Sequence, residues 1–124
     1  MYKILLVGLG GFAGSSARYL MQLVFPHYPG AFPWGTFLIN IIGSLLIGII
    51  YGLAEEHKIM NQEMRLLLAI GFCGSFTTFS TFSVENLQMF QMGSYAHLIV
   101  NIVLSVTLGI MAVIVGIQLT RYFV

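Results

Sequence analysis

Residues 71–85 combine helix-breaking and hydroxyl-bearing side chains inside a long apolar segment. Two glycines and two adjacent threonines fall within eight positions, and a glycine costs about 1 kcal/mol relative to alanine inside a helix. Phe79 and Phe82 follow, with hydroxyl side chains around them. In hydrocarbon, non-helical backbone survives only where it is buried in protein or lines a wet cavity. We therefore expect a transmembrane helix that is broken near residues 74–78.

Such a break would expose two kinds of backbone group. Carbonyl oxygens at the end of the first half-helix are hard ligands that suit Na⁺ or a similar cation. The N–H groups that open the second half-helix suit an anion. Phenylalanine rings have a positive edge, so ring edges and hydroxyls together could replace part of the water around a small anion. Aromatic residues at helical spacing are more often packing residues, and that alternative stays open for Phe79 and Phe82.

The composition places this stretch in a membrane protein. Of the 124 residues, 58% are hydrophobic and 7% are charged, whereas soluble domains carry about 25% charged residues. A net charge of +1 gives no case for a nucleic-acid partner. The single cysteine cannot form an intrachain disulfide. No nucleophile–base pair or metal-ligand cluster occurs at a workable spacing, so we do not expect an enzyme.

Four apolar segments approach the ~20 residues that a spanning helix requires. They cover about residues 4–24, 34–54, 66–90 and 95–119. We expect one all-α integral membrane domain, residues 1–124, whose third transmembrane helix is broken at mid-membrane. If all four segments span, both termini and the charged 55–65 loop share one side, and that side carries four of the five Lys and Arg residues. The positive-inside rule then places it in the cytoplasm.

Isolated polar residues in the other segments are further candidates. Arg18 could reach the headgroups, or it could face a vestibule where its charge attracts an anion. Asn40 needs a partner in hydrocarbon, either across a helix interface or as an N–H donor facing a pore. Asn101 and Ser105 share one helix face, which is typical of hydrogen bonding between membrane helices. The residues alone leave these alternatives open.

Small residues four apart have a simpler interpretation. Residues 8–13 match the spacing of a dinucleotide-binding loop, but that motif needs an acid about 20 residues later. The chain has no Asp or Glu in its first 54 residues. Gly10 with Gly14, and Gly48 with Gly52, instead predict close contact between helices.

The run from Gly74 to Glu85 resembles the signature of the Fluc fluoride channels, also called CrcB. The resemblance extends to residues 14–18 and 35–40 and covers all four segments. It implies four-helix subunits that pair as an antiparallel, dual-topology dimer. It also implies passive export of F⁻ from the cytoplasm through two pores, which flank a central structural Na⁺ at the dimer interface.

The resemblance assigns roles by motif position. The backbone carbonyls of Gly74 and Thr77 would hold the Na⁺. The pore residues would be Asn40, Phe79 and Phe82, with a polar track from Ser80, Thr81, Ser83 and Ser105. Glu85 matches an acid that follows the family motif, and the residues do not give its role. Asn101 falls where some members have an aromatic hydroxyl.

Several alternatives remain at this point. A homodimer is the expected assembly, but the Lys and Arg bias towards one side also fits a pair of distinct, homologous chains. A small dual-topology multidrug exporter has a similar size, although that class uses an acid in its first helix. A non-transporting membrane scaffold is the third possibility. In each case we expect a multi-pass protein in the lipid bilayer of a bacterial or archaeal plasma membrane.

Overall fold

A computed structural model describes residues 1–56 and 58–124, and residue 57 of the predicted 55–65 loop lies outside the described part. Every regular element in that part is helical. In chain order the elements are α1 (Tyr2–Val24), α2 (Trp34–Tyr51), η1 (Gly52–Glu56), α3 (Gln62–Arg65), η2 (Leu66–Cys73), α4 (Gly74–Phe76), α5 (Ser80–Gln91) and α6 (Tyr95–Phe123). The two η elements are π-helical, with a wider turn than an α-helix.

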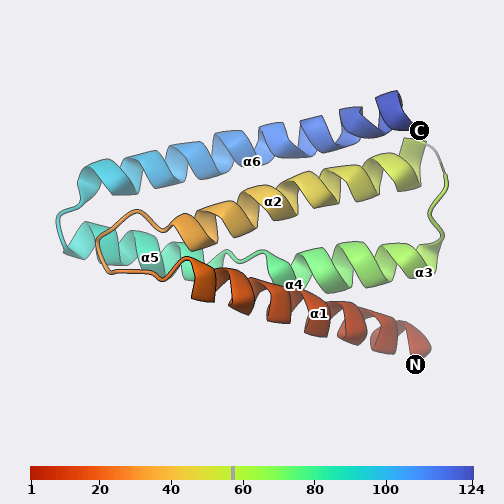
Figure 1. Ribbon diagram of the computed structural model, residues 1–124, viewed down its shortest axis with the longest axis horizontal. Coiled ribbons are helices and arrows are strands. Elements are labelled where there is room, and N and C mark those ends of the chain that lie inside the picture. Colours follow the sequence, from red (N-terminus) through yellow and green to blue (C-terminus); the bar gives the residue numbers. More distant parts are fainter. Residues whose placement is uncertain (57) are drawn as a thin grey trace.

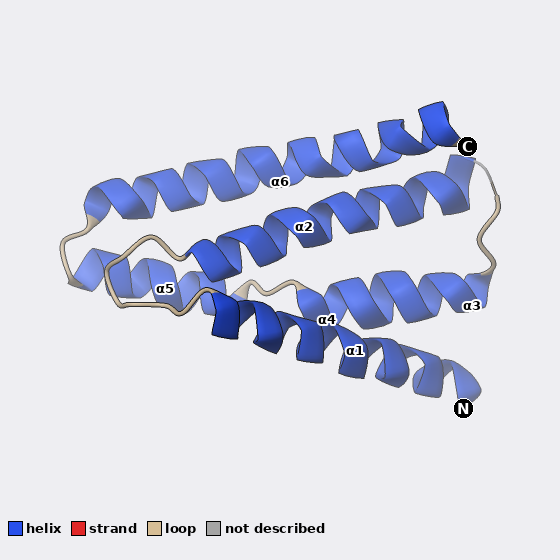
Figure 2. Ribbon diagram, viewed as in Figure 1, coloured by secondary structure: helices blue, strands red, loops and turns tan. Residues whose placement is uncertain are grey.

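Four stretches are long and apolar enough to cross a membrane, which confirms the predicted all-α membrane architecture. They are Tyr2–Val24, Trp34–Glu55, Gln62–Gln91 and Tyr95–Phe123. The helices run along one long axis, and both termini lie at the same end as the connection between η1 and α3 (Figure 1). Loops occupy the two ends, apart from one short stretch between α4 and α5 in the middle of the third span (Figure 2).

Glycines bring α1 against the third span. A methyl group added at Gly10 would overlap the carbonyl oxygen of Leu67, and one added at Gly14 would overlap that of Phe72. Lipid tails are as apolar as leucine side chains, so membrane helices associate through close packing of small residues. The predicted contact face of Gly10 and Gly14 is therefore confirmed, and its partner is η2.

Glycines also bring α2 against α6. A methyl group at Gly48 would overlap the backbone of Val113, and one at Gly116 would overlap the carbonyl oxygen of Leu45. Gly52, which opens η1, lies against the side chain of Thr120. The predicted contacts of Gly48 and Gly52 are confirmed, and α2–α6 is an extensive helix interface.

The third span is interrupted at residues 77–79. Gly74 remains helical, and the chain leaves the helix at Thr77, whose backbone is extended at φ −74° and ψ 157°. Thr77 also donates its hydroxyl to the carbonyl of Cys73 at 2.9 Å. A threonine hydroxyl bonded in this way competes with the helical ladder. The break therefore begins three residues after the glycine, at the threonine pair.

Candidate functional site

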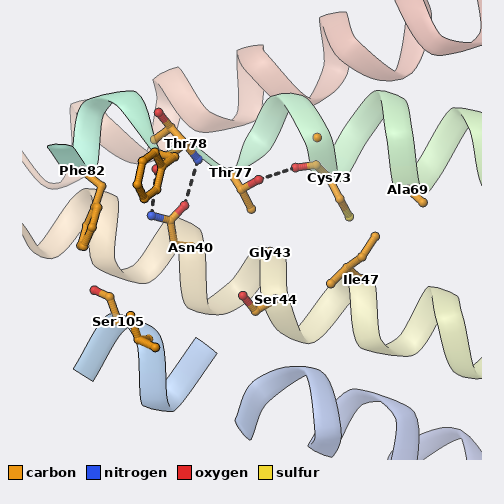
Figure 3. A pocket seen from close by; sticks show the side chains of 13 residues that line it. Asn40, Gly43, Ser44, Ile47, Ala69, Cys73, Thr77, Thr78, Phe82 and Ser105 are labelled. Atoms are coloured by element: carbon orange, nitrogen blue, oxygen red, sulfur yellow. Dashed lines mark hydrogen bonds between the residues drawn. The ribbon is translucent and has the colours of Figure 1, made fainter. Parts of the chain in front are cut away.

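Asn40 holds the broken backbone in place. Its Nδ2 donates to the carbonyl oxygen of Thr78 at 3.0 Å, and its Oδ1 accepts from the Thr78 N–H at 2.9 Å. Figure 3 shows this pair of bonds between α2 and the stretch that follows α4. An unpaired backbone group in hydrocarbon costs several kcal/mol. The side-chain amide thus replaces the helical partners that Thr78 has lost, and one hydrogen of its NH₂ group remains beyond this pair.

The same pairing changes the hydrogen bonding at Gly74. In a continuous helix the N–H of Thr78 would bond to the carbonyl of Gly74, four residues earlier, but it bonds to Asn40 instead. Among the described residues, no backbone N–H outside the helices' own ladders reaches the Gly74 carbonyl. Gly74 is exposed and lines a cavity. Its carbonyl oxygen therefore lacks the donor that a continuous helix would provide.

Arg18 approaches the break from α1. Its Nη1 donates to the carbonyl oxygen of Thr77 at 3.5 Å, at the outer limit of a hydrogen bond. The side chain therefore faces the third span and is half-buried, and its role at a vestibule stays a prediction. It does not line the cavity described next.

A cavity of about 430 Å³ opens beside the break. Its wall includes four of the residues named from the sequence for the pore: Asn40, Phe79, Phe82 and Ser105. The centroids of the two phenylalanine rings are 5.8 Å apart. Phe79 is 79% exposed, so it is not part of the buried core of this chain. The close-up places Ser105 on α6, across from Asn40 on α2 (Figure 3).

The other hydroxyls form a cluster at the start of α5. The hydroxyl of Thr78 donates to that of Thr81 at 3.1 Å, and its oxygen lies 3.5 Å from the hydroxyl of Ser80. Ser83 instead donates back to the carbonyl of Phe79 at 2.9 Å. Neither Ser80, Thr81 nor Ser83 lines the 430 Å³ cavity. The structure thus divides the predicted polar track, with Ser105 on the cavity and the α5 hydroxyls beyond it.

A second cavity, of about 250 Å³, lies beside these hydroxyls. Thr81 and the buried Glu85 are part of its wall. Glu85 accepts a hydrogen bond from the hydroxyl of Thr36 at 2.7 Å through Oε1. Its Oε2 is buried and has no hydrogen-bond partner among the described residues. His27 lies within 3.1 Å of the side chain of Gln88 at the same cavity.

On the α6 side, a chain of three polar groups reaches the 430 Å³ cavity. Ser105 donates to Oδ1 of Asn101 at 3.2 Å, and Nδ2 of Asn101 donates to Oδ1 of Asn86 at 2.8 Å. Asn101 is 1% exposed. This arrangement is the hydrogen bonding between helices that the shared face of Asn101 and Ser105 predicted, and it links α6 to α5.

The roles of three residues of this region were not recognised from the sequence. Thr78 provides the backbone that Asn40 clamps, Thr36 is the partner of Glu85, and Asn86 is the partner of Asn101. The positions of Glu85 and Asn86 in an apolar span were the available signal, because a buried charge or amide needs a partner. Which residue supplies that partner depends on how helices distant in sequence pack.

A family model described as "CrcB-like protein, Camphor Resistance (CrcB)" matches residues 5–117. This range includes the break, the residues that line the two cavities, and the hydrogen-bonded Ser105, Asn101 and Asn86. The chain belongs to the CrcB family. A relative named "Fluoride-specific ion channel FluC" from Phocaeicola vulgatus is 46% identical over 98% of this chain and 100% of its own length. Relatives of the same name from Leptospira interrogans and Azobacteroides pseudotrichonymphae are 42% and 38% identical over 98% of this chain.

Membership of the CrcB family agrees with the resemblance seen in residues 74–85. The identity to these relatives spans almost the whole chain, so it includes all four membrane-spanning stretches. A CrcB protein with four such helices is a multi-pass membrane protein.

Proposed function

We propose that this chain is the subunit of a fluoride-selective channel that lets F⁻ leave the cytoplasm passively. The observation that carries the proposal is the interrupted third span, whose break opens on a cavity lined by Asn40, Phe79, Phe82 and Ser105. The names of the relatives, which cover nearly the whole chain, support fluoride as the ion.

The chemistry of the cavity suits a small, strongly hydrated anion. Fluoride needs hydrogen-bond donors to replace its water, and Asn40 keeps one N–H beyond its pair with Thr78. The positive edges of Phe79 and Phe82 offer further favourable contact. Arg18 places a fixed positive charge near the break without occupying the cavity. A passive route of this kind requires no nucleotide and no reacting group.

Two subunits would complete the channel. One chain leaves the ring of Phe79 largely exposed and the wall of the cavity open. A second copy in antiparallel orientation would cover the ring and close the cavity wall. Closed two-fold pairing is the commonest form of assembly. We propose a homodimer, with a dimer of two homologous chains as the alternative. Two pores would then lie at the dimer interface.

A structural Na⁺ fits the backbone at the break. The carbonyl of Gly74 has lost its helical donor to Asn40, and the carbonyl of Thr77 accepts a long bond of 3.5 Å from Arg18. Among the described residues, no group of three His, Cys, Asp or Glu side chains could hold a metal. Carbonyl oxygens of Gly74 and Thr77 from two subunits would supply four hard ligands for the cation.

Fluoride efflux from proteoliposomes tests the proposal. We expect liposomes with the purified protein to release F⁻ far faster than Cl⁻, and Phe79→Ile and Phe82→Ile to slow the release. A measured rate for chloride equal to that for fluoride would end the selectivity claim. Proton-coupled export of an aromatic cation would instead favour a multidrug exporter, and a folded protein without any ion flux would favour a scaffold.

A further inference from the structure

The two hydrogen bonds that link Ser105, Asn101 and Asn86 have a donor-to-acceptor direction that matters for an anion. Ser105 has one hydroxyl hydrogen, and in this structure it points to Oδ1 of Asn101. A hydroxyl that donates away from the 430 Å³ cavity presents only its lone pairs there. Ser105 lines that cavity. In the arrangement described, it would repel a fluoride ion rather than bind it.

Reversing the two amides reverses the hydroxyl. If Asn101 turns its side chain over, Nδ2 donates to Ser105 and Oδ1 faces Asn86. Asn86 must then turn as well, so that its own Nδ2 donates to Asn101. Each arrangement contains two hydrogen bonds with donor and acceptor exchanged, and in the arrangement described the heavy atoms lie 3.2 Å and 2.8 Å apart. Only the second leaves the hydrogen of Ser105 free to point into the cavity.

Burial makes the two amides turn together. Asn101 is 1% exposed and Asn86 is 9% exposed, and a buried amide without a partner costs about 1–3 kcal/mol. Turning one amide alone would place two oxygens or two NH₂ groups in contact and remove the hydrogen bond between Asn101 and Asn86. An arriving anion favours the second arrangement, because a hydrogen bond to a charged acceptor is roughly twice as strong as a neutral one.

We propose that Asn86 and Asn101 form a reversible hydrogen-bond relay that decides whether Ser105 donates into the cavity. The two asparagines are positioning residues, because they act on the ion only through Ser105. The inference rests on the proposed fluoride function. The inference adds a pair of amides to that function. They would let the Ser105 hydroxyl donate into the cavity when fluoride is present, and present only its lone pairs there when fluoride is absent.

A double-mutant cycle on fluoride efflux tests the relay. Asn86→Asp, assayed at pH 8 to favour the carboxylate, can only accept, so it fixes Asn101 and keeps the Ser105 hydrogen away from the cavity. We expect it to slow efflux about tenfold, as Ser105→Ala should, because each removes one hydrogen bond to a charged acceptor. The double variant should be no slower than either single variant. A double variant about a hundredfold slower would mean independent effects and would overturn the relay.

Ser105→Ala also serves as the control for the added charge. If the carboxylate merely repelled fluoride, it would slow efflux equally with and without the hydroxyl. An unmodified protein that releases no fluoride would overturn the proposed function and the relay together. Normal efflux from the unmodified protein with independent effects in the cycle would overturn the relay alone.

A neutral pair of substitutions covers the case in which Asn86→Asp does not fold. Asn86→Leu with Asn101→Leu replaces both partners by apolar groups of similar size, which can be nearly neutral for stability. The Ser105 hydroxyl is then no longer held by a side-chain amide, so we expect efflux at least as fast as in the unmodified protein. Adding Ser105→Ala to this pair should slow it about tenfold. Loss of efflux in the folded Leu pair itself would contradict the relay.

Discussion

At the scale of single residues, one side-chain amide makes the broken helix possible. Asn40 donates to and accepts from the backbone of Thr78, at 3.0 Å and 2.9 Å. Thr78 is buried, so both groups would otherwise lack a partner in hydrocarbon. The sequence left open whether Asn40 joins helices or faces a pore. The structure shows that it does the first while it also lines the cavity.

We expect Asn40→Leu to lower the stability of the protein substantially. The substitution leaves the N–H and the carbonyl of Thr78 unpaired, at about 1–3 kcal/mol for each group. Asn61→Ala is the matched control, since the side chain of Asn61 makes one bond, to the N–H of Met64 at 2.9 Å, at an exposed helix start. That loss should cost only about 1 kcal/mol. Thermal unfolding in detergent measures both, and equal losses would refute the special role of Asn40.

At the scale of elements, glycines set how closely the helices approach. Gly14 of α1 lies against the backbone of Phe72 in η2, so the helix and the π-helical segment touch without side chains between them. This contact brings Arg18, one turn further along α1, within reach of Thr77. The position of the charge at the break therefore depends on a glycine contact in a neighbouring turn.

We expect Gly14→Ala to disrupt the α1–η2 contact. The new methyl group would overlap the carbonyl oxygen of Phe72, and overpacking of this kind typically costs about 1–3 kcal/mol. Gly8→Ala is the control on the same helix, because nothing lies within 4 Å of a methyl group there. It should be neutral or stabilising by up to about 1 kcal/mol, from helix propensity. Thermal unfolding of the two variants should differ clearly, and identical curves would contradict the packing described.

At the scale of the whole molecule, the proposed channel needs two chains. The cavity beside the break is open, and Phe79, which is part of its wall, is 79% exposed. In the proposed dimer, the carbonyls of Gly74 and Thr77 of one chain would provide half of the four oxygens that hold the Na⁺. A second subunit would cover the cavity and supply the missing oxygens, so assembly and ion binding should depend on each other.

We therefore expect Na⁺ to stabilise a dimer of this protein. A ligand that binds only the assembled state raises its apparent stability according to the ligand concentration. Replacing Na⁺ by a large organic cation such as N-methylglucamine should lower the melting temperature of the purified protein and weaken its dimer. Light scattering in detergent, in the two salts at equal ionic strength, measures the mass. A monomer in both salts, or a melting temperature that does not change when Na⁺ is replaced, would contradict the proposed cation site.

The sequence by itself determined the class of the fold and the place of the break. Apolar length and the scarcity of charge require four membrane helices, because hydrocarbon excludes charged side chains and unpaired backbone whatever the packing. Glycines and threonines crowded at 71–78 locate the interruption within a few residues for the same local reason.

Only the tertiary structure decided which groups complete one another. That Asn40 clamps Thr78, that Glu85 meets Thr36 and that Asn101 meets Asn86 could not be predicted. Each pair joins residues from different parts of the bundle. A polar group in an apolar span indicates that a partner is needed, but the sequence does not indicate where that partner lies. Its identity depends on the rotation and approach of whole helices, which the glycine contacts set.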